Sequence, residues 1–215
     1  MDLRRHLTGQ NIALVTVFAG FIAASTLWGG VEFAAGVPFT LQTFAVLLAG
    51  AVLGPWRGAA AVLIYLLLGT AGLPIFAGHT TGAVAWPSAT AGFLIGFLPA
   101  AFVTGWIVRG LRRRSALTFS GAFGAAVMGG LVVLYPIGWG YVAWKAGLDF
   151  TATVIGAAPF AVFDLIKCVF VGLVATAVHR AYPWILPAKP QSKVTSVTDA
   201  APASGSEANE ALATA

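Results

Sequence analysis

The chain consists of long runs of hydrophobic residues, separated by short segments rich in glycine, proline or polar residues. A helix that crosses the hydrocarbon core of a bilayer needs about 20 mainly apolar residues, or fewer where other segments share the depth. The stretches that meet this requirement are 11–29, 40–54, 58–73, 91–108, 116–137 and 159–181. The pattern predicts an all-α integral membrane protein, a bundle of six transmembrane helices.

The second and third predicted helices are separated only by residues 54–58, Gly-Pro-Trp-Arg-Gly. Proline and glycine favour tight turns. We therefore expect these two helices to be antiparallel neighbours.

The positions of the basic residues predict the orientation of the bundle. Lys and Arg in short loops are retained on the cytoplasmic side. With the N-terminus inside, every arginine falls on that side: Arg4, Arg5, Arg57, Arg109, Arg112, Arg113, Arg114 and Arg180. Six helices then place both termini in the cytoplasm and make 30–39, 74–90 and 138–158 the outward connections.

The composition supports a multi-pass membrane protein. Hydrophobic residues make up 59% of the chain and charged residues 9%, whereas soluble domains carry about 25% charged residues. The net charge of +5 follows from the membrane orientation and does not indicate nucleic-acid binding. Residues 187–215 are rich in Ala, Ser, Pro and Glu, which predicts a disordered cytoplasmic tail after a transmembrane domain at 1–186.

Two charged residues lie inside the last apolar run. Asp164 and Lys167 are three residues apart, so a helix places them on one face. Ionisable residues within a membrane span are costly and usually mark a pair or a substrate path. The two residues either bridge only each other and fix helix packing, or they face a polar cavity and contact a ligand.

The outward segments offer further candidates for ligand contact. Gln42 carries a buried amide that can donate and accept hydrogen bonds, and nearby Thr40 suits a helix cap. The segment 72–92 has the composition of a lid, with apolar, polar and flexible positions. The candidate binding residues in these segments are Phe39, Gln42, Phe76, Gly78, His79 and Trp86. Trp139, Tyr141, Trp144 and Lys145, in the third connection, are typical of an interfacial aromatic belt.

The first helix carries small residues four positions apart, Ala19 with Ala23 and Gly20 with Ala24. Such spacing lets another helix approach closely. The stripe serves either packing within the chain or docking of a partner subunit.

Several catalytic motifs are missing from the sequence. It contains no GxxxxGK[ST] phosphate loop, no HExxH and no serine nucleophile elbow. His79 has no second ligand at metal spacing, and Cys168 is the only cysteine. We therefore expect neither an enzyme nor a bound metal or cofactor.

Two parts of the sequence resemble the BioY biotin transporters, the substrate-capture components of energy-coupling factor (ECF) transporters. Residues 37–78, VPFTLQTFAVLLAGAVLGPWRGAAAVLIYLLLGTAGLPIFAG, resemble the family signature. Asp164-x-x-Lys167 resembles the Asp-x-x-Lys segment of its last helix. The resemblance extends over about residues 11–185.

The resemblance implies an ECF S-component bundle in a bacterial plasma membrane that holds biotin in an outward-facing pocket. Asp164 and Lys167 would contact the ligand, and the loop at 77–82 would cover it. Ala19 and Ala23 would dock on a transmembrane coupling subunit. Two separate ATPase subunits would hydrolyse ATP, and biotin would be the transported ligand rather than a cofactor.

The chemistry of biotin leads to a working hypothesis for the site. Phe39, Phe76 and Trp86 would cover the rings and chain, Lys167 would lie near the carboxylate, and Asp164 with Gln42 would address the ureido group. Alternatively, Asp164 mainly keeps Lys167 charged.

Residues 79–93 replace the Gly-rich loop and Gly-Pro-Thr-Gly-Gly-Tyr-like motif of the family, so another vitamin or a biotin analogue is an alternative substrate. A membrane-embedded enzyme using Asp164 or His79 is a further alternative, without a visible second catalytic group.

Overall fold

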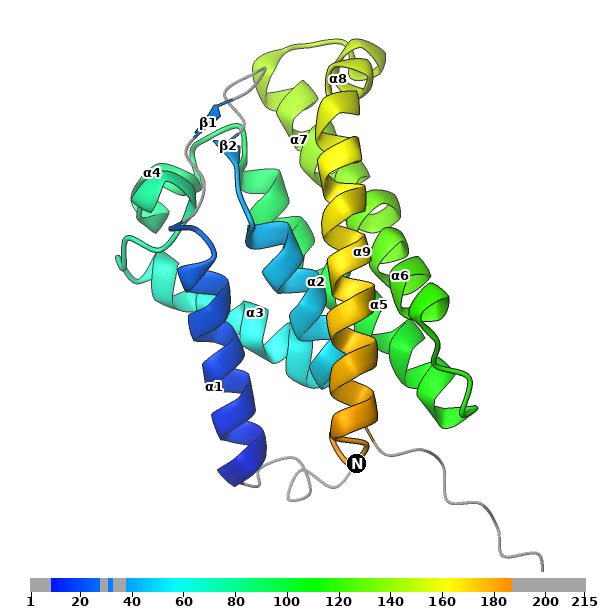
Figure 1. Ribbon diagram of the computed structural model, residues 1–215. Helices are drawn as coiled ribbons and strands as arrows, with labels where there is room; N and C mark the ends of the chain where they lie inside the picture. Colours follow the sequence, from blue (N-terminus) through cyan, green and yellow to red (C-terminus); the bar gives the residue numbers. More distant parts are fainter. Residues whose placement is uncertain (1–8, 28–30, 33–37, 187–215) are drawn as a thin grey trace, which may run out of the picture.

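The structure is a computed structural model that describes residues 9–27, 31–32 and 38–186, and it is a bundle of helices (Figure 1). The longer helices are α1 (Gly9–Ala24), α2 (Gln42–Leu53), α3 (Pro55–Thr70), α5 (Ala91–Arg113), α6 (Phe119–Val127), α7 (Tyr135–Ala146) and α9 (Ala158–Ala181). A π-helical segment, Met128–Leu134, joins α6 to α7. The shorter elements are the 3₁₀ turn Ala77–His79, α4 (Gly82–Ala85), α8 (Phe150–Gly156) and the antiparallel strands β1 (Val31–Glu32) and β2 (Pro38–Phe39).

Helix α2 forms the centre of the bundle. It packs against α1, α3, α5 and α9, and nearly all of its residues are buried. Its sequence is apolar on every side, which is the pattern of a helix surrounded by other helices. α2 therefore fixes the positions of the helices around it.

Helices α2, α3 and α5 cross closely because small residues lie at the crossing. A Cβ atom on Gly58 would lie 2.7 Å from the Cα of Gly50, and one on Gly105 would lie 2.6 Å from the carbonyl carbon of Gly54. A Cβ on Gly50 would collide with the carbonyl oxygen of Ala101. Small residues at membrane helix crossings allow such close backbone contact.

The turn between α2 and α3 is shorter than the sequence predicts. Only Gly54, with a φ of 83°, separates the two helices, and Pro55 already belongs to the first turn of α3. Proline suits this position because it lacks the N–H that a first helical turn leaves unpaired. The expected turn at 54–58 is thus a single residue, and α2 and α3 are neighbours as predicted.

The fifth predicted helix ends at residue 137, but the observed helix continues to Ala146. Pro136 does not break it, because this residue is in the first turn of α7, directly after the π-helical segment. The helix ends instead at Gly147, whose left-handed φ of 64° is a common stop signal. Most of the predicted third outward connection is therefore helical.

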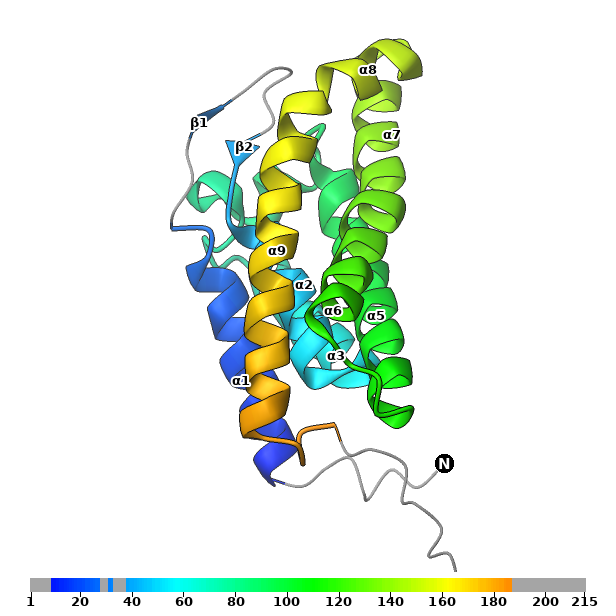
Figure 2. The same ribbon diagram turned by 45° about the vertical axis from the view of Figure 1, so that its right-hand side comes forward.

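Three described helices are long and apolar enough to cross a membrane: Ala91–Arg113, Phe119–Ala146 and Ala158–Ala181. α1, α2 and α3 are apolar but shorter. The start of α1 and the end of α9 lie at one end of the bundle, and β1, β2 and α8 lie at the other (Figures 1 and 2). On α9, large apolar side chains such as Phe170, 53% exposed, face outward, as expected for a helix in contact with lipid.

Candidate functional site

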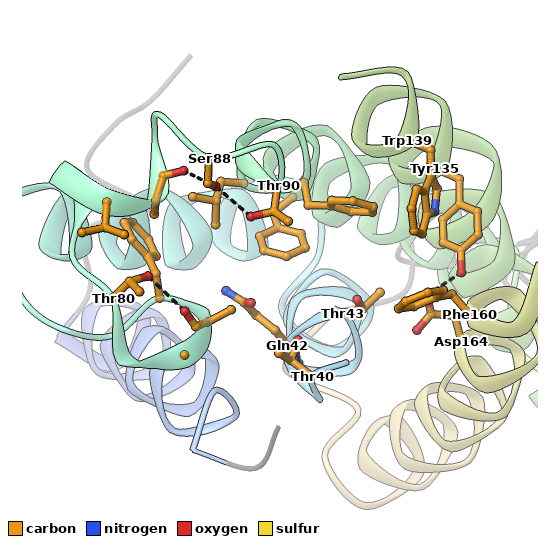
Figure 3. A pocket seen from close by; sticks show the side chains of 18 of the residues that line it. Thr40, Gln42, Thr43, Thr80, Ser88, Thr90, Tyr135, Trp139, Phe160 and Asp164 are labelled. Atoms are coloured by element: carbon orange, nitrogen blue, oxygen red, sulfur yellow. Dashed lines mark hydrogen bonds between the residues drawn. The ribbon is translucent and has the colours of Figure 1, made fainter. Parts of the chain in front are cut away.

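A cavity of about 350 Å³ opens among α2, α5, α7, α9 and the segment between α3 and α5. Its size is at the lower end of the range for small-molecule sites, about 300–1,000 Å³. Its wall combines hydroxyl, amide, aromatic and charged side chains (Figure 3). The lining residues are Thr40, Gln42, Thr43, Phe76, Ala77, Gly78, Thr80, Val84, Ala85, Ser88, Thr90, Phe93, Leu94, Phe97, Tyr135, Trp139, Phe160, Asp164 and Lys167.

Asp164 and Lys167 form an ion pair in the cavity wall. Lys167 Nζ lies 2.7 Å from Asp164 Oδ1 and donates a second hydrogen bond of 2.7 Å to the carbonyl oxygen of Thr40. The other carboxylate oxygen, Asp164 Oδ2, accepts a 2.7 Å hydrogen bond from the Tyr135 hydroxyl. This network joins α9 to α7 and to the start of α2.

The pair is buried, with Asp164 7% and Lys167 6% exposed. Burial of a charge costs several kcal/mol unless a partner and further hydrogen bonds compensate it. An ionised carboxylate accepts about four hydrogen bonds, of which Tyr135 and Lys167 supply two. Asp164 therefore retains acceptor capacity at the cavity surface.

Gln42 and Thr40 present polar groups from the start of α2. The Gln42 side-chain amide donates a hydrogen bond to the Tyr65 hydroxyl, which donates in turn to the carbonyl of Ile75. The Thr40 hydroxyl accepts a 3.3 Å hydrogen bond from the backbone N–H of Gln42. Thr40 thus satisfies one amide at the start of α2, although Leu41 is the residue at the cap position.

The segment between α3 and α4 is folded around Phe76. The Phe76 ring is 1% exposed, packs edge-on against Tyr65 and Trp86, and lies where a side chain on Gly69 would be. The backbone N–H of Phe76 donates to the carbonyl of Thr80, 3.1 Å away, and closes a turn. Within this turn Gly78 has a φ of 69°.

Aromatic side chains from α5, α7 and α9 form the wall beside Asp164. Trp139 is 3% exposed and packs edge-on against Phe93, Tyr135 and Phe160. Its indole Nε1 makes no hydrogen bond within the described part of the chain. Trp139 is thus a wall residue rather than part of an interfacial belt, whereas Trp144 is 74% exposed.

The structure brings some of the predicted binding residues together and separates others. Those that line the cavity are Asp164, Lys167, Gln42, Phe76 and Gly78. His79 is exposed and Trp86 stands behind Phe76, with its Nε1 donating to Thr70 Oγ1 at 2.9 Å; neither lines the cavity. The backbone of Phe39 pairs with Val31, and its side chain lies outside the described part of the structure.

The small residues of α1 face in two directions. Ala19 is 3% exposed and belongs to the core together with Ile22, and Ala23 is partly buried against that core. Ala19 therefore packs within the chain. Gly20 and Ala24 are exposed.

Tyr135 and Trp139 are the main wall residues that sequence reasoning did not select. They lie one helical turn apart on α7, just after the π-helical segment. A tyrosine deep in an apolar run was the available signal, because a buried phenol needs a hydrogen-bond partner. Among the described residues, no group of three His, Cys, Asp or Glu side chains is placed to hold a metal ion.

Comparison with known proteins places this architecture in a family. Residues 2–184 match the BioY family. A protein of Rhodobacter capsulatus named biotin transporter BioY is 41% identical over 189 residues, which cover 84% of this chain and 98% of the relative. The chain belongs to the BioY family.

A second BioY relative, from Rhizobium etli and also named biotin transporter BioY, is 41% identical over 187 residues, covering 85% of this chain and all of the relative. The fold also resembles a crystal structure of the S-component for biotin from an ECF-type ABC transporter, with a TM-score of 0.76. That alignment covers 84% of this chain and 95% of the other at 20% identity, so it shows a shared fold.

Proposed function

We propose that this protein captures biotin and supports its transport as the substrate-binding component of an ECF-type transporter. The observation that carries the proposal is the buried Asp164–Lys167 pair on the cavity wall of a BioY-family bundle. The nearly full-length likeness to two biotin transporters supports biotin as the ligand. The protein then acts as a transporter component and not as an enzyme.

The proposed binding site consists of the polar network and the apolar wall around the cavity. Asp164 accepts ureido N–H donors and Gln42 offers its amide to the same ring. Phe76 and the aromatic wall cover the apolar part of the ligand. Gly78 lies in the turn that borders the cavity, with His79 and Trp86 in the second layer of this lid and Phe39 on the adjoining strand.

The proposed topology has six membrane spans, with both termini in the cytoplasm of a bacterial cell. The described arginines support this orientation, because they lie at the start of α3 and at the ends of α5 and α9. Arg57 donates a 2.9 Å hydrogen bond to Asn11 at the start of α1, and Arg112 donates to the carbonyls of Pro183 and Leu186 after α9. Residues 187–215 would form a cytoplasmic tail after the domain at 1–186.

The proposed partners are a transmembrane coupling subunit and two ATPase subunits. The coupling subunit would contact the stripe of small residues on α1. Of this stripe, Gly20 and Ala24 are exposed, and a Cβ on Gly20 would meet no atom within 4 Å. Ala23 borders the same surface, and buried Ala19 supports the helix from inside.

Binding of radiolabelled biotin to the purified protein in detergent tests the capture role, with thiamine, riboflavin and desthiobiotin as competitors. We expect saturable, stoichiometric binding that only biotin-like compounds displace. Displacement by another vitamin would reassign the substrate. A chemically altered ligand after incubation would point to an enzyme.

A further inference from the structure

The two ends of the cavity differ in depth and in charge. Asp164 and Lys167 are less than 10% exposed and form the deep, charged end beside Tyr135. At the other end, Gly78 and Val84 line the cavity and are also exposed. Figure 3 shows Tyr135, Trp139, Phe160 and Asp164 on one side, Thr80 and Ser88 on the other, and Gln42, Thr43 and Thr90 between them.

The deep end is poorly suited to an anionic group. The charges of Asp164 and Lys167 compensate each other at 2.7 Å, and Lys167 also donates to Thr40. A ligand carboxylate close to Lys167 would lie near the Asp164 carboxylate, and like charges repel strongly where water is excluded. Neutral N–H donors, by contrast, match the remaining acceptor capacity of Asp164.

The shallow end offers an anion no charged partner. Its hydroxyl groups are engaged locally, because Thr80 Oγ1 donates to the carbonyl of Ala77 at 3.0 Å and Ser88 Oγ to that of Ala85 at 2.7 Å. Thr90 Oγ1 lies 2.9 Å from Ser88 Oγ. Lys167 is the only basic residue among the described lining residues, and the sequence at 28–39 contains no Lys, Arg or His.

We propose that the pocket recognises the neutral ureido ring at Asp164 and leaves the acyl end of the ligand at Thr80, Ser88 and Thr90 without a charge partner. Biotin amides are then ligands of this protein as well as biotin. This inference rests on the proposed function, which already places the ureido ring at Asp164, and adds the placement of the acyl end and the substrate class. It gives Lys167 the role of holding Asp164, not that of pairing with the ligand carboxylate.

Biotinamide provides the direct test, because it has nearly the same shape as biotin and lacks the negative charge. We would measure the dissociation constants of biotin and biotinamide on the purified full-length protein by competition with radiolabelled biotin. The proposal predicts that the two constants differ by less than tenfold. A loss of tenfold or more for biotinamide overturns it, because a charge-assisted contact to the carboxylate is then present.

The other end of the ligand provides a matched probe. Biotin with a methyl group on one ureido nitrogen loses an N–H donor and keeps its carboxylate. We expect it to bind at least tenfold more weakly than biotin, because Asp164 loses one of its partners. A loss of less than tenfold would show that the ring does not lie at Asp164, and would refute the proposed orientation.

Variants identify the charge partner if one exists. In the proposed orientation, the ratio of the biotinamide and biotin constants stays below ten in Lys167→Met and in His79→Gln. A preference for biotin that disappears in Lys167→Met would assign the carboxylate to Lys167, and one that disappears in His79→Gln would assign it to the lid. Either result contradicts the proposal.

Failure of this inference is distinguishable from failure of the proposed function. If folded protein does not bind biotin at all, the capture role itself is wrong, and so is the proposed placement of the ligand. If biotin binds tightly and biotinamide fails, biotin capture stands and only the proposed placement of the acyl end is refuted.

Discussion

The crossing of α2, α3 and α5 and the wall formed by α7 and α9 are held together by different means. At the crossing, the backbones approach so closely that Gly50, Gly58 and Gly105 leave no room for a Cβ atom. At the wall, Tyr135, Asp164 and Lys167 are held by hydrogen bonds and opposite charge. The crossing depends on residues that have no side chain, whereas the wall depends on hydrogen bonds and an ion pair. Different substitutions should therefore damage each.

The largest effect is expected where a buried charge loses its partner. Asp164→Leu leaves the Lys167 ammonium buried without its carboxylate, which should lower the free energy of unfolding by about 3–5 kcal/mol. The double variant Asp164→Leu/Lys167→Leu should recover most of that loss, because the unpaired charge is removed. Thermal unfolding in detergent measures both variants. A double variant no more stable than the single one would contradict the role of the pair in stability.

Biotin binding separates stability from recognition in the same variants. The double variant should remain unable to bind biotin although it is folded, because Asp164 no longer accepts from the ligand. Tight binding by the folded double variant would remove the pair from the proposed site.

The crossing should be sensitive to added volume. Gly50→Val forces a side chain against the carbonyl of Ala101, and overpacking of this kind costs about 1–3 kcal/mol. We expect a lower unfolding temperature or loss of folded protein. Gly20→Ala is the matched control, because open space surrounds that position and alanine favours a helix over glycine, so its unfolding temperature should not fall. Equal stability of the two variants would mean that the crossing can relax.

A single hydrogen bond at the wall should have a smaller effect. Tyr135→Phe removes the hydroxyl that donates to Asp164 Oδ2, and a hydrogen bond to a charged group contributes about 1.5–3 kcal/mol. The Asp164 carboxylate and its ion pair with Lys167 remain but lose one positioning contact, so we expect biotin affinity to fall by about tenfold or less. Isothermal titration would measure the change. A loss as complete as in the Asp164 variants would place Tyr135 in direct contact with the ligand.

The sequence revealed the paired charges but not the aromatic wall. Asp164 and Lys167 stand out because charge inside an apolar run is costly, and their spacing alone places them on one helical face. Tyr135 and Trp139 follow a π-helical segment, where the hydrogen-bond pattern shifts and the faces of the helix rotate. A regular 3.6-residue period therefore does not predict which side chains enter the cavity.

The positions of the long helices along the chain were predictable, because each is a continuous apolar run. Their ends were less so. Pro136 looks like a break in the sequence, yet the helix continues to Ala146, because the proline directly follows the π-helical segment, where the hydrogen-bond pattern shifts. The lid was not predictable from residue chemistry alone. Trp86 and His79 have suitable chemistry for ligand contact, but the turn closed by Phe76 and Thr80 determines which side chains reach the cavity.

The smallest predicted effect concerns a polar atom buried on α5. The Thr104 hydroxyl is fully buried on α5 and has no hydrogen-bond partner among the described residues. Thr104→Val keeps the shape of the side chain and removes the unpaired group, so the free energy of unfolding should rise by up to about 1 kcal/mol. Thr153→Val is the matched control, because the Thr153 hydroxyl donates a 2.8 Å hydrogen bond to the carbonyl of Asp149 and its loss should destabilise. If both variants lose stability, the Thr104 hydroxyl has a partner, and the packing of α5 against the π-helical segment depends on a polar contact.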